Sequence, residues 1–193
     1  MKNFARNLVI ILIVSLLFCG CVSSNEKNAV KKITELYFSS LESGNFAVAN
    51  QLVFQADSSI QAEIDDIEVN RFIFKNISYD LWGIKKDDDG ILYADLVIHQ
   101  LSLSTAVSRT AVEYNDYVSD AFSGGKVFTN EALENKWNSL LLKNVKSVDE
   151  TVSKRCSVPL SVQDDGTIII HMTAEFRNCL FGGELDAINA LKS

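Results

Sequence analysis

Residues 151–177 read TVSKRCSVPLSVQDDGTIIIHMTAEFR, and this stretch has the clearest structural pattern in the chain. Apolar and polar residues alternate on both sides of the central DDG, which is a turn signal. Such alternation is typical of strands that have one buried face and one solvated face. We therefore predict a two-stranded antiparallel ribbon in which Ile170 points inward and His171 points outward.

Two features next to this ribbon add to the prediction. Pro159 falls on the polar face, and because proline cannot donate to a ladder, we expect it at a sheet edge or a bulge. A closing helix is predicted over residues 178–191, where large apolar residues recur at helical spacing. Gly182 and Gly183 near its start would allow close approach of a neighbouring segment.

A second hairpin is predicted upstream of the ribbon. Residues 71–86 and 91–103 are rich in strand-forming residues, and the KKDDDG at 85–90 between them is a turn signal. A calcium loop needs acids at alternate positions and a glutamate further on, and neither is present here. The three adjacent carboxylates therefore predict a solvated turn.

Helices are predicted before and between the two hairpins. Helical spacing occurs over residues 30–41, 46–54, 105–123 and 129–145, with a weaker stretch at 58–66. Helices segregated from two hairpins are typical of an α+β domain. We therefore expect a curved, mainly antiparallel sheet packed against N-terminal, central and C-terminal helices.

The N-terminus has the pattern of a secretory signal peptide. Residues 8–22 read LVIILIVSLLFCGCV behind two basic residues, and this run is shorter than the roughly 20 residues of a membrane-spanning helix. Gly20-Cys21 at its end resembles the lipobox of prokaryotic lipoproteins, which implies that Cys21 is lipidated and becomes the mature N-terminus. An uncleaved membrane anchor and a soluble secreted product remain open as alternatives.

This interpretation divides the chain into a signal peptide (1–20), a tether (21–27) and one domain (28–193). The lipid on Cys21 would hold the domain at the extracytoplasmic face of the cell membrane. Removing the signal takes the net charge from −7 to about −9. An acidic chain without basic clusters argues against nucleic acid as a partner and against electrostatic binding to anionic lipid.

Two cysteines, Cys156 and Cys179, lie outside the signal. A disulfide can persist in an exported domain, but a tight hairpin would place residue 156 opposite 175, so a bridge would need a bend in the second strand. A disulfide and two buried thiols both remain open. Neither the cysteine spacing nor any other motif predicts a metal or a cofactor.

Two segments carry a resemblance to a known fold. Residues 37–52 (YFSSLESGNFAVANQL) combine a helix, a Gly-Asn break and a second helix, and residues 167–191 run from a strand into an apolar segment with Gly-Gly. Both resemble uncharacterised prokaryotic lipoproteins with a nuclear-transport-factor-two-like cone domain. The resemblance implies a cone-like sheet capped by helices. The helical pair at 105–145 departs from that pattern and leaves the strand order open.

Enzymes of the cone superfamily place an Asp base and Tyr or His donors inside the cavity. The residues of matching type here are Asp80, Tyr93, Asp95, His99 and His171. The alternation places all but Asp80 on polar faces, and no hydrolase, phosphate-binding or dinucleotide motif is present. We therefore expect no enzyme but a binding or interaction module for an envelope protein or a small apolar ligand. A cryptic hydrolase or isomerase and a structural accessory domain are the alternatives.

Overall fold

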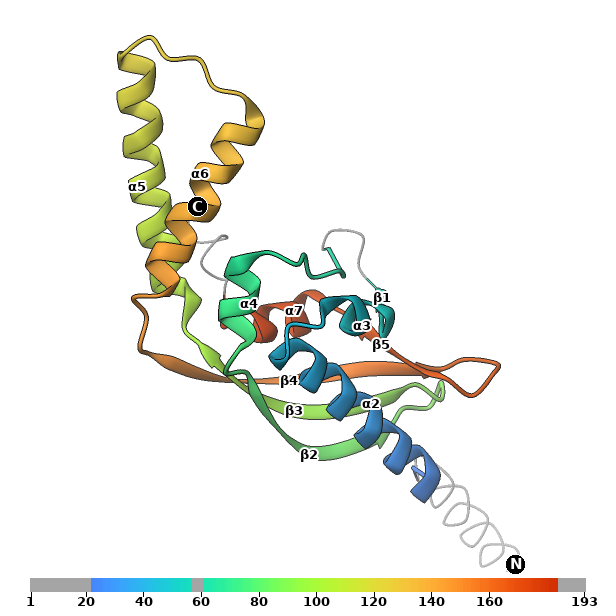
Figure 1. The fold of residues 1–193 in the computed structure, drawn as a ribbon. Coiled ribbons are helices and arrows are strands. Elements are labelled where there is room, and N and C mark those ends of the chain that lie inside the picture. Colours follow the sequence, from blue (N-terminus) through green and yellow to red (C-terminus); the bar gives the residue numbers. More distant parts are fainter. Residues whose placement is uncertain (1–21, 57–60, 184–193) are drawn as a thin grey trace, which may run out of the picture.

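The computed structural model describes residues 22–56 and 61–183. In this part of the chain, six helices and a five-stranded open sheet form an α+β fold, as predicted (Figure 1). The strand order is β1-β5-β4-β3-β2. The signal segment, Cys21 and the end of the predicted closing helix lie outside the described residues.

Both predicted hairpins are present. The first joins β2 (Ser78–Lys86) to β3 (Leu92–Leu101), and the second joins β4 (Thr151–Val162) to β5 (Ile168–Met172). Antiparallel pairing of β3 with β4 unites the two hairpins along the full length of β3. The short strand β1 (Val53–Gln55) adds to β5 in parallel, so the sheet is mixed rather than wholly antiparallel.

The helices cover one face of the sheet, except for a helical hairpin that projects from the body (Figure 1). The covering helices are α2 (Ser24–Glu42), α3 (Phe46–Gln51), α4 (Glu68–Phe74) and α7 (Ala174–Leu180). The projecting hairpin consists of α5 (Leu103–Ser123) and α6 (Asn130–Val145), which confirms the predicted central pair. It begins directly after β3 and returns to β4, so it lies between the two sheet hairpins in the chain.

The alternation in the strands identifies the core correctly. On β3, the side chains of Leu92, Ala94, Leu96 and Ile98 are buried, and the residues between them are half-buried. On β5, Ile170 is 2% exposed while His171 is half-buried on the opposite face. The inward and outward assignments of the closing ribbon are therefore confirmed.

The predicted helix at 46–54 is wrong at its end. α3 stops at Gln51, and the next residues pair with β5, where the Ile170 amide donates to the Leu52 carbonyl at 3.0 Å. The sequence around Val53 is equally suitable for a helix or a strand, so the choice depends on the free edge of β5.

Residues 71–74, predicted as strand, belong to helix α4 instead. The side chains of Val69, Ile73 and Phe74 are buried, which is the i, i+4, i+5 spacing of one helix face. A short apolar run of this kind fits a helix or a strand by pattern alone. The weaker helix expected at 58–66 is not formed over 61–66, which is irregular.

The last strand is shorter than predicted. β5 ends at Met172, and the Thr173 hydroxyl accepts a hydrogen bond from the Phe176 amide and caps α7. The predicted continuation of the strand through residue 177 is therefore wrong, and the closing helix begins before residue 178. After α7, Gly182 adopts a φ of 57°, and a Cβ at this position would overlap the Leu101 carbonyl oxygen, which confirms the expected close approach.

Pro159 does not lie on an edge strand, because β4 has β3 on one side and β5 on the other. The β4–β5 ladder, however, covers only Leu160 to Val162. Pro159 lies one residue beyond it, where β3 is the one strand that pairs with β4. The missing N–H is tolerated because the ladder stops there.

The N-terminal tether is shorter than expected. Residues 24–27 belong to α2, whose first turn is held by a capping box between Ser23 and Glu26. The Ser23 hydroxyl accepts from the Glu26 amide at 3.2 Å, and the Glu26 carboxylate accepts from the Ser23 amide at 2.8 Å. This reciprocal pair is a strong local signal for a helix start.

Candidate functional site

Two of the residues singled out in the sequence meet on the outer face of the sheet. His99 Nε2 lies 3.0 Å from Asp80 Oδ2, and His99 Nδ1 lies 2.8 Å from Ser153 Oγ. Ser153 was missed in the sequence, because its position opposite His99 depends on the pairing of β3 with β4. The three residues form a hydrogen-bonded Ser–His–Asp chain across three strands.

The hydrogen-bonded residues Ser153, His99 and Asp80 lack the surroundings that a catalytic triad needs. The side chain of Asp80 is 75% exposed, so the charge that would orient His99 is largely solvated. Acyl transfer also requires N–H donors aimed at the developing oxyanion. His99 lies on β3, whose backbone is paired with β2 on one side and with β4 on the other. We therefore interpret the hydrogen bonds among these three residues as a polar cross-strand contact on the outer face.

Tyr93 and Asp95 lie on the same face and share Lys85 as a neighbour, because the Lys85 ammonium pairs with Asp95 and lies 5.9 Å from the centroid of the Tyr93 ring. The Tyr93 hydroxyl donates to Asp87 Oδ2 at 3.1 Å, and this hydrogen bond raises the pKa of the phenol. Asp95 Oδ1 accepts from Lys85 at 3.0 Å and from Ser157 at 2.7 Å. The candidate residues are therefore not collected in one site, since Asp80 and His99 form one group and Tyr93 and Asp95 form a second group around Lys85.

His171 lies near the opposite edge of this face. Its Nε2 is 2.8 Å from Ser161 Oγ, and its ring contacts the ring of Phe54 edge-on. Partial burial lowers the pKa of His171. This residue is thus a cross-strand partner, as expected from its place in the ribbon.

Cys156 and Cys179 are both buried and are not joined by a disulfide in this structure, and the Cys179 thiol donates to the Arg155 carbonyl at 3.6 Å. The hydrogen bond with the Cys179 thiol, followed by burial, raises the pKa of Cys156, so the thiol stays protonated. The two residues meet because α7 folds back over β4, not because they face each other in the ribbon. The disulfide stays a prediction for an oxidising compartment.

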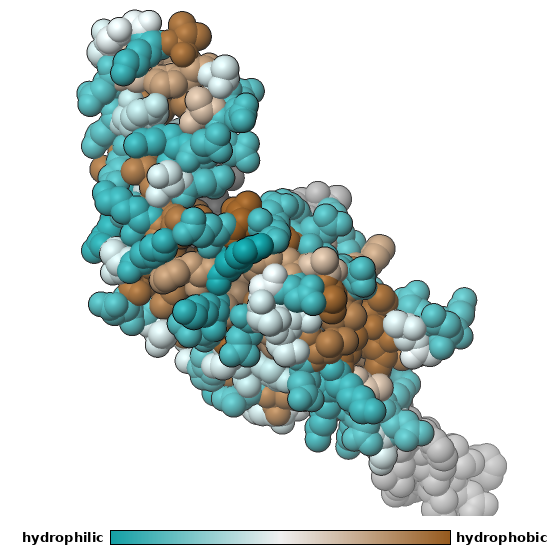
Figure 2. All heavy atoms as spheres, viewed as in Figure 1, coloured by the Kyte–Doolittle hydropathy of each residue, from teal (hydrophilic) through white to brown (hydrophobic). Residues whose placement is uncertain are grey.

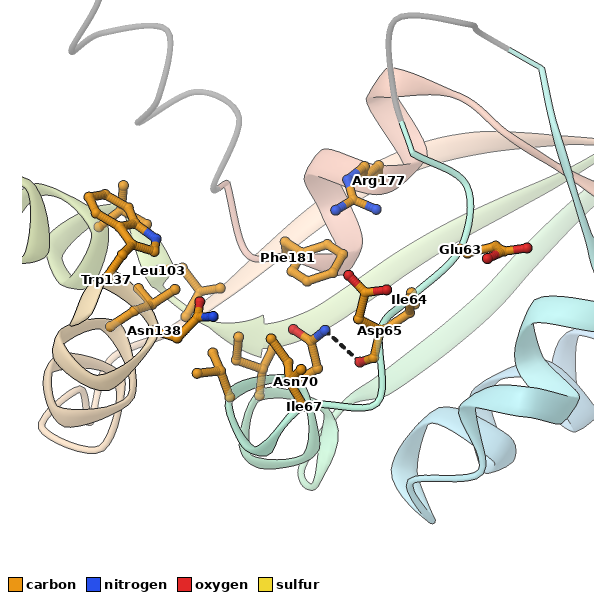
Figure 3. A pocket seen from close by; sticks show the side chains of 14 residues that line it. Glu63, Ile64, Asp65, Ile67, Asn70, Leu103, Trp137, Asn138, Arg177 and Phe181 are labelled. Atoms are coloured by element: carbon orange, nitrogen blue, oxygen red, sulfur yellow. Dashed lines mark hydrogen bonds between the residues drawn. The ribbon is translucent and has the colours of Figure 1, made fainter. Parts of the chain in front are cut away.

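A cleft forms where the projecting hairpin meets the body, and Figure 2 shows apolar side chains gathered at this junction. Its volume is about 170 Å³. The walls come from the loop before α4, from α4 itself, from the bases of α5 and α6, and from α7 with the residue after it (Figure 3). The apolar part of its lining consists of Ile64, Ile67, Val69, Ile73, Leu103, Val107, Trp137, Leu141 and Phe181.

Arg177 supplies the positive charge of this cleft. Its Nη1 donates to the Gln61 carbonyl at 2.8 Å, and its guanidinium lies over the Phe181 ring, 4.6 Å from the centroid. Phe181 lies one helical turn after Arg177, whereas Gln61 belongs to the loop before α4. The remaining guanidinium donors are thus left for other acceptors.

Asp65 supplies a negative charge from the facing loop. The Asn50 side chain holds this loop through the backbone of Ile64, with hydrogen bonds of 2.9 and 3.0 Å. The Asn70 amide holds the Asp65 carbonyl at 2.9 Å. The backbone on both sides of Asp65 is therefore fixed, and its carboxylate is directed by the fold rather than by an ion pair.

Trp137 and Asn138 form the far wall of the cleft, on α6. The Trp137 ring packs edge-on against Tyr114 of α5 at 5.4 Å, which fixes the indole. Trp137 belongs to the segment 129–145, which was predicted as a helix from its apolar spacing. Neither Arg177 nor Asp65 was expected in a site, because they lie 112 positions apart and no motif connects them.

Comparison with known proteins does not identify a family for this chain. No family model, no curated protein and no solved structure matches the chain. Among the described residues, no helix is long and apolar enough to cross a membrane. The function must therefore be argued from the cleft and from the N-terminal sequence.

Proposed function

We propose that this protein is an extracytoplasmic binding module whose cleft takes a small amphipathic ligand. One observation carries the proposal. The cleft has an apolar floor, while Arg177, Asp65 and Asn138 present polar groups along it. Ligand sites typically combine a largely apolar lining with a few placed polar groups.

The volume limits the size of the ligand. An apolar cavity of about 150 Å³ holds a benzene molecule, so a cleft of about 170 Å³ takes a group of that size or slightly larger. The purely apolar ligand expected from the sequence fits less well, because it would bury the charged rim without partners. An amphipathic ligand satisfies both parts of the lining.

Binding is tested most directly through Trp137. The chain has two tryptophans, so Trp82→Phe leaves Trp137 as the single fluorophore of its kind. Small amphipathic compounds titrated into this variant should change the Trp137 emission at up to millimolar concentration. If no compound of a diverse collection changes it, the binding proposal is wrong.

A matched pair of variants on α6 locates the ligand. Asn138→Phe fills the cleft and should weaken any such binding at least tenfold. Asn135→Phe makes the same change at an exposed position of the same helix and should leave binding unchanged. Equal losses in both variants would place the ligand elsewhere.

We propose further that lipid on Cys21 anchors the module at the outer face of the cell membrane. The support is the signal-like N-terminus and the early start of α2, which leaves a short connection between Cys21 and the domain. Mass spectrometry should find an acylated N-terminus at Cys21. Cys21→Ser should leave an unprocessed precursor, whereas the neighbouring Cys19→Ser should be processed, and an unmodified N-terminus elsewhere would refute the anchor.

The cone-like description is also part of this proposal. It is supported by helices on a single face of the sheet and by the register shift between Leu81 and Gly83, since a bulge bends the strand that carries it. A cone-like sheet would curve around α2 and α4. An experimental structure of the domain in which the sheet is flat beside α2 and α4 would contradict the cone-like description.

A further inference from the structure

We infer that the ligand of the cleft is a zwitterion of the α-amino-acid type with an apolar side chain. This inference rests on the proposed binding function and names the chemical class that the lining selects. Its basis is the juxtaposition of Arg177, Asp65 and an apolar floor of limited volume.

The two charges at the mouth are close to each other but not paired. In Figure 3 the guanidinium of Arg177 and the carboxylate of Asp65 point toward one another beside the Phe181 ring. No ion pair joins either residue to another charged group in the described part of the chain. Gln61 contacts both residues, through its carbonyl to Arg177 and through its side-chain amide to Asp65, and a ligand that contacts both charges would replace the long hydrogen bonds of the Gln61 side chain.

Each charge retains bonding capacity. Arg177 uses one of its N–H groups for the Gln61 carbonyl, and a guanidinium has five. The Asp65 carboxylate accepts only long hydrogen bonds of 3.4 and 3.5 Å, both from the side-chain amide of Gln61. A ligand carboxylate can thus bind Arg177 bidentately, and a ligand ammonium can donate to Asp65.

The opposite signs of Arg177 and Asp65 disfavour a ligand that carries only one charge. A plain anion bound to Arg177 would lie against Asp65 and Glu63, and a plain cation bound to Asp65 would lie against Arg177. Like charges brought close together repel, and this repulsion disfavours a ligand with a single charge even at these solvent-accessible side chains. A molecule that carries both charges on adjacent atoms satisfies the two residues at once.

The floor selects the rest of the ligand. Beyond the charged mouth, the cleft is lined by apolar side chains from three helices, among them Ile73, Val107 and Leu141. The volume of about 170 Å³ suits a branched aliphatic or single-ring side chain and is too small for a long peptide. Leucine is therefore a suitable probe.

The test uses the full domain with Trp82→Phe and four probes of equal side chain. L-leucine should bind, and N-acetyl-L-leucine, L-leucinamide and 3-methylbutylamine should each bind at least tenfold more weakly. N-acetyl-L-leucine lacks the ammonium. L-leucinamide has a neutral amide in place of the carboxylate, and 3-methylbutylamine has neither carboxylate nor amide. These comparisons need no destabilising substitution.

Variants then assign each charge. Asp65→Asn should weaken L-leucine at least tenfold, whereas N-acetyl-L-leucine should bind equally well or more tightly, because it has no ammonium to lose a partner and its carboxylate is no longer repelled by Asp65. Asp66→Asn is the matched control, because Asp66 is the next acid in the same loop and pairs with Arg71 outside the cleft. Arg177→Lys keeps the charge but loses the bidentate geometry, and should affect L-leucine more than 3-methylbutylamine.

The outcomes separate this inference from the proposed function. Equal binding of L-leucine and its derivatives would overturn the zwitterion class and keep the cleft as a binding site. If none of the four probes binds but another compound changes the Trp137 emission, the class is again wrong and the binding function stands. If Trp137 responds to nothing, both are wrong.

Discussion

The two faces of the sheet have different sources of stability, although the same strands supply both. The inner face is packed under helices, and its residues on β3 are at most 1% exposed for Leu92, Ala94, Leu96 and Ile98. No helix of the described residues covers the outer face, and its polar side chains bind one another across strands, as Asp80, His99 and Ser153 do. Burial of apolar area stabilises the first face, and exposed polar pairs contribute little to the second.

The difference shows where a hydropathy pattern is informative. On the inner face each apolar side chain loses its contact with water, so its position in the alternation decides its place. On the outer face the contacts depend on which strands are neighbours, and this information is absent from any single strand. The predictions below test whether the two faces differ as strongly as their packing indicates.

Ile170→Ala should produce the largest effect. Ile170 is 2% exposed, and truncation of such a side chain typically costs about 2–5 kcal/mol. Ile169→Ala, one residue earlier on the half-buried face, should cost clearly less. Urea unfolding of both variants measures the difference, and equal costs would mean that the outer face is covered as well.

Gly182→Ala should come next, at about 2–4 kcal/mol. A Cβ here overlaps the backbone of Leu101 at the end of β3, in addition to the strain of a positive φ. Gly166→Ala provides the matched control, because this turn glycine also has a positive φ but has open space around it. Its cost should stay near 1 kcal/mol in the same unfolding assay, and similar costs would exclude the close approach.

Glu26 should make the stability of the domain depend on pH, because it joins α2 to β2 through its ion pair with Lys86. Hydrogen bonds from Lys86 and from Ser23 lower the pKa of Glu26 from 4.5 to about 2. Because the folded state favours the charged carboxylate, its contribution should be present above about pH 4.5 and be lost as the pH falls toward 2.

Glu26→Gln separates the two roles of this residue. Glutamine retains the capping bond but not the ion pair with Lys86, so we expect a loss of at most about 1 kcal/mol at pH 7. The variant should also lose part of the acid dependence in thermal unfolding between pH 5 and pH 2. An unchanged slope would show that Glu26 does not titrate in this range.

His171 should give the smallest effect. Its pKa is lowered by partial burial, so the folded state favours the neutral ring. Stability should therefore be complete above the usual histidine pKa of about 6.5 and decrease slightly as the pH falls below it. His171→Ala should change unfolding at pH 7.5 by less than about 0.5 kcal/mol and remove this decrease at pH 5.5. A large loss at pH 7.5 would mean that the Ser161 contact carries more than its exposure suggests.

Some errors of the sequence interpretation have identifiable local causes. Thr173 precedes Phe176 by three residues and caps α7, but the alternation through Met172 concealed this start signal. Ser23 and Glu26 have the spacing of a capping box, which would have extended α2 backward into the predicted tether. These two helix starts were available in the sequence.

Other differences could not be predicted from local sequence. Val53 and its neighbours become a strand because β5 offers a free edge, and residues 71–74 become helix because that helix face completes the core. Cys156 and Cys179 meet because α7 returns over β4. Each outcome depends on a partner that is distant in the chain.

The sequence by itself determined the α+β class, the two hairpins, the helical pair between them and the inward faces of β3, β4 and β5. It could do so because periodicity in apolar residues directly reflects which side chains leave water. Only the tertiary structure decided the strand order, the parallel edge strand and the cleft between Asp65 and Arg177. A site of this kind consists of residues from separate elements, and their distances arise only when the helices pack on the sheet.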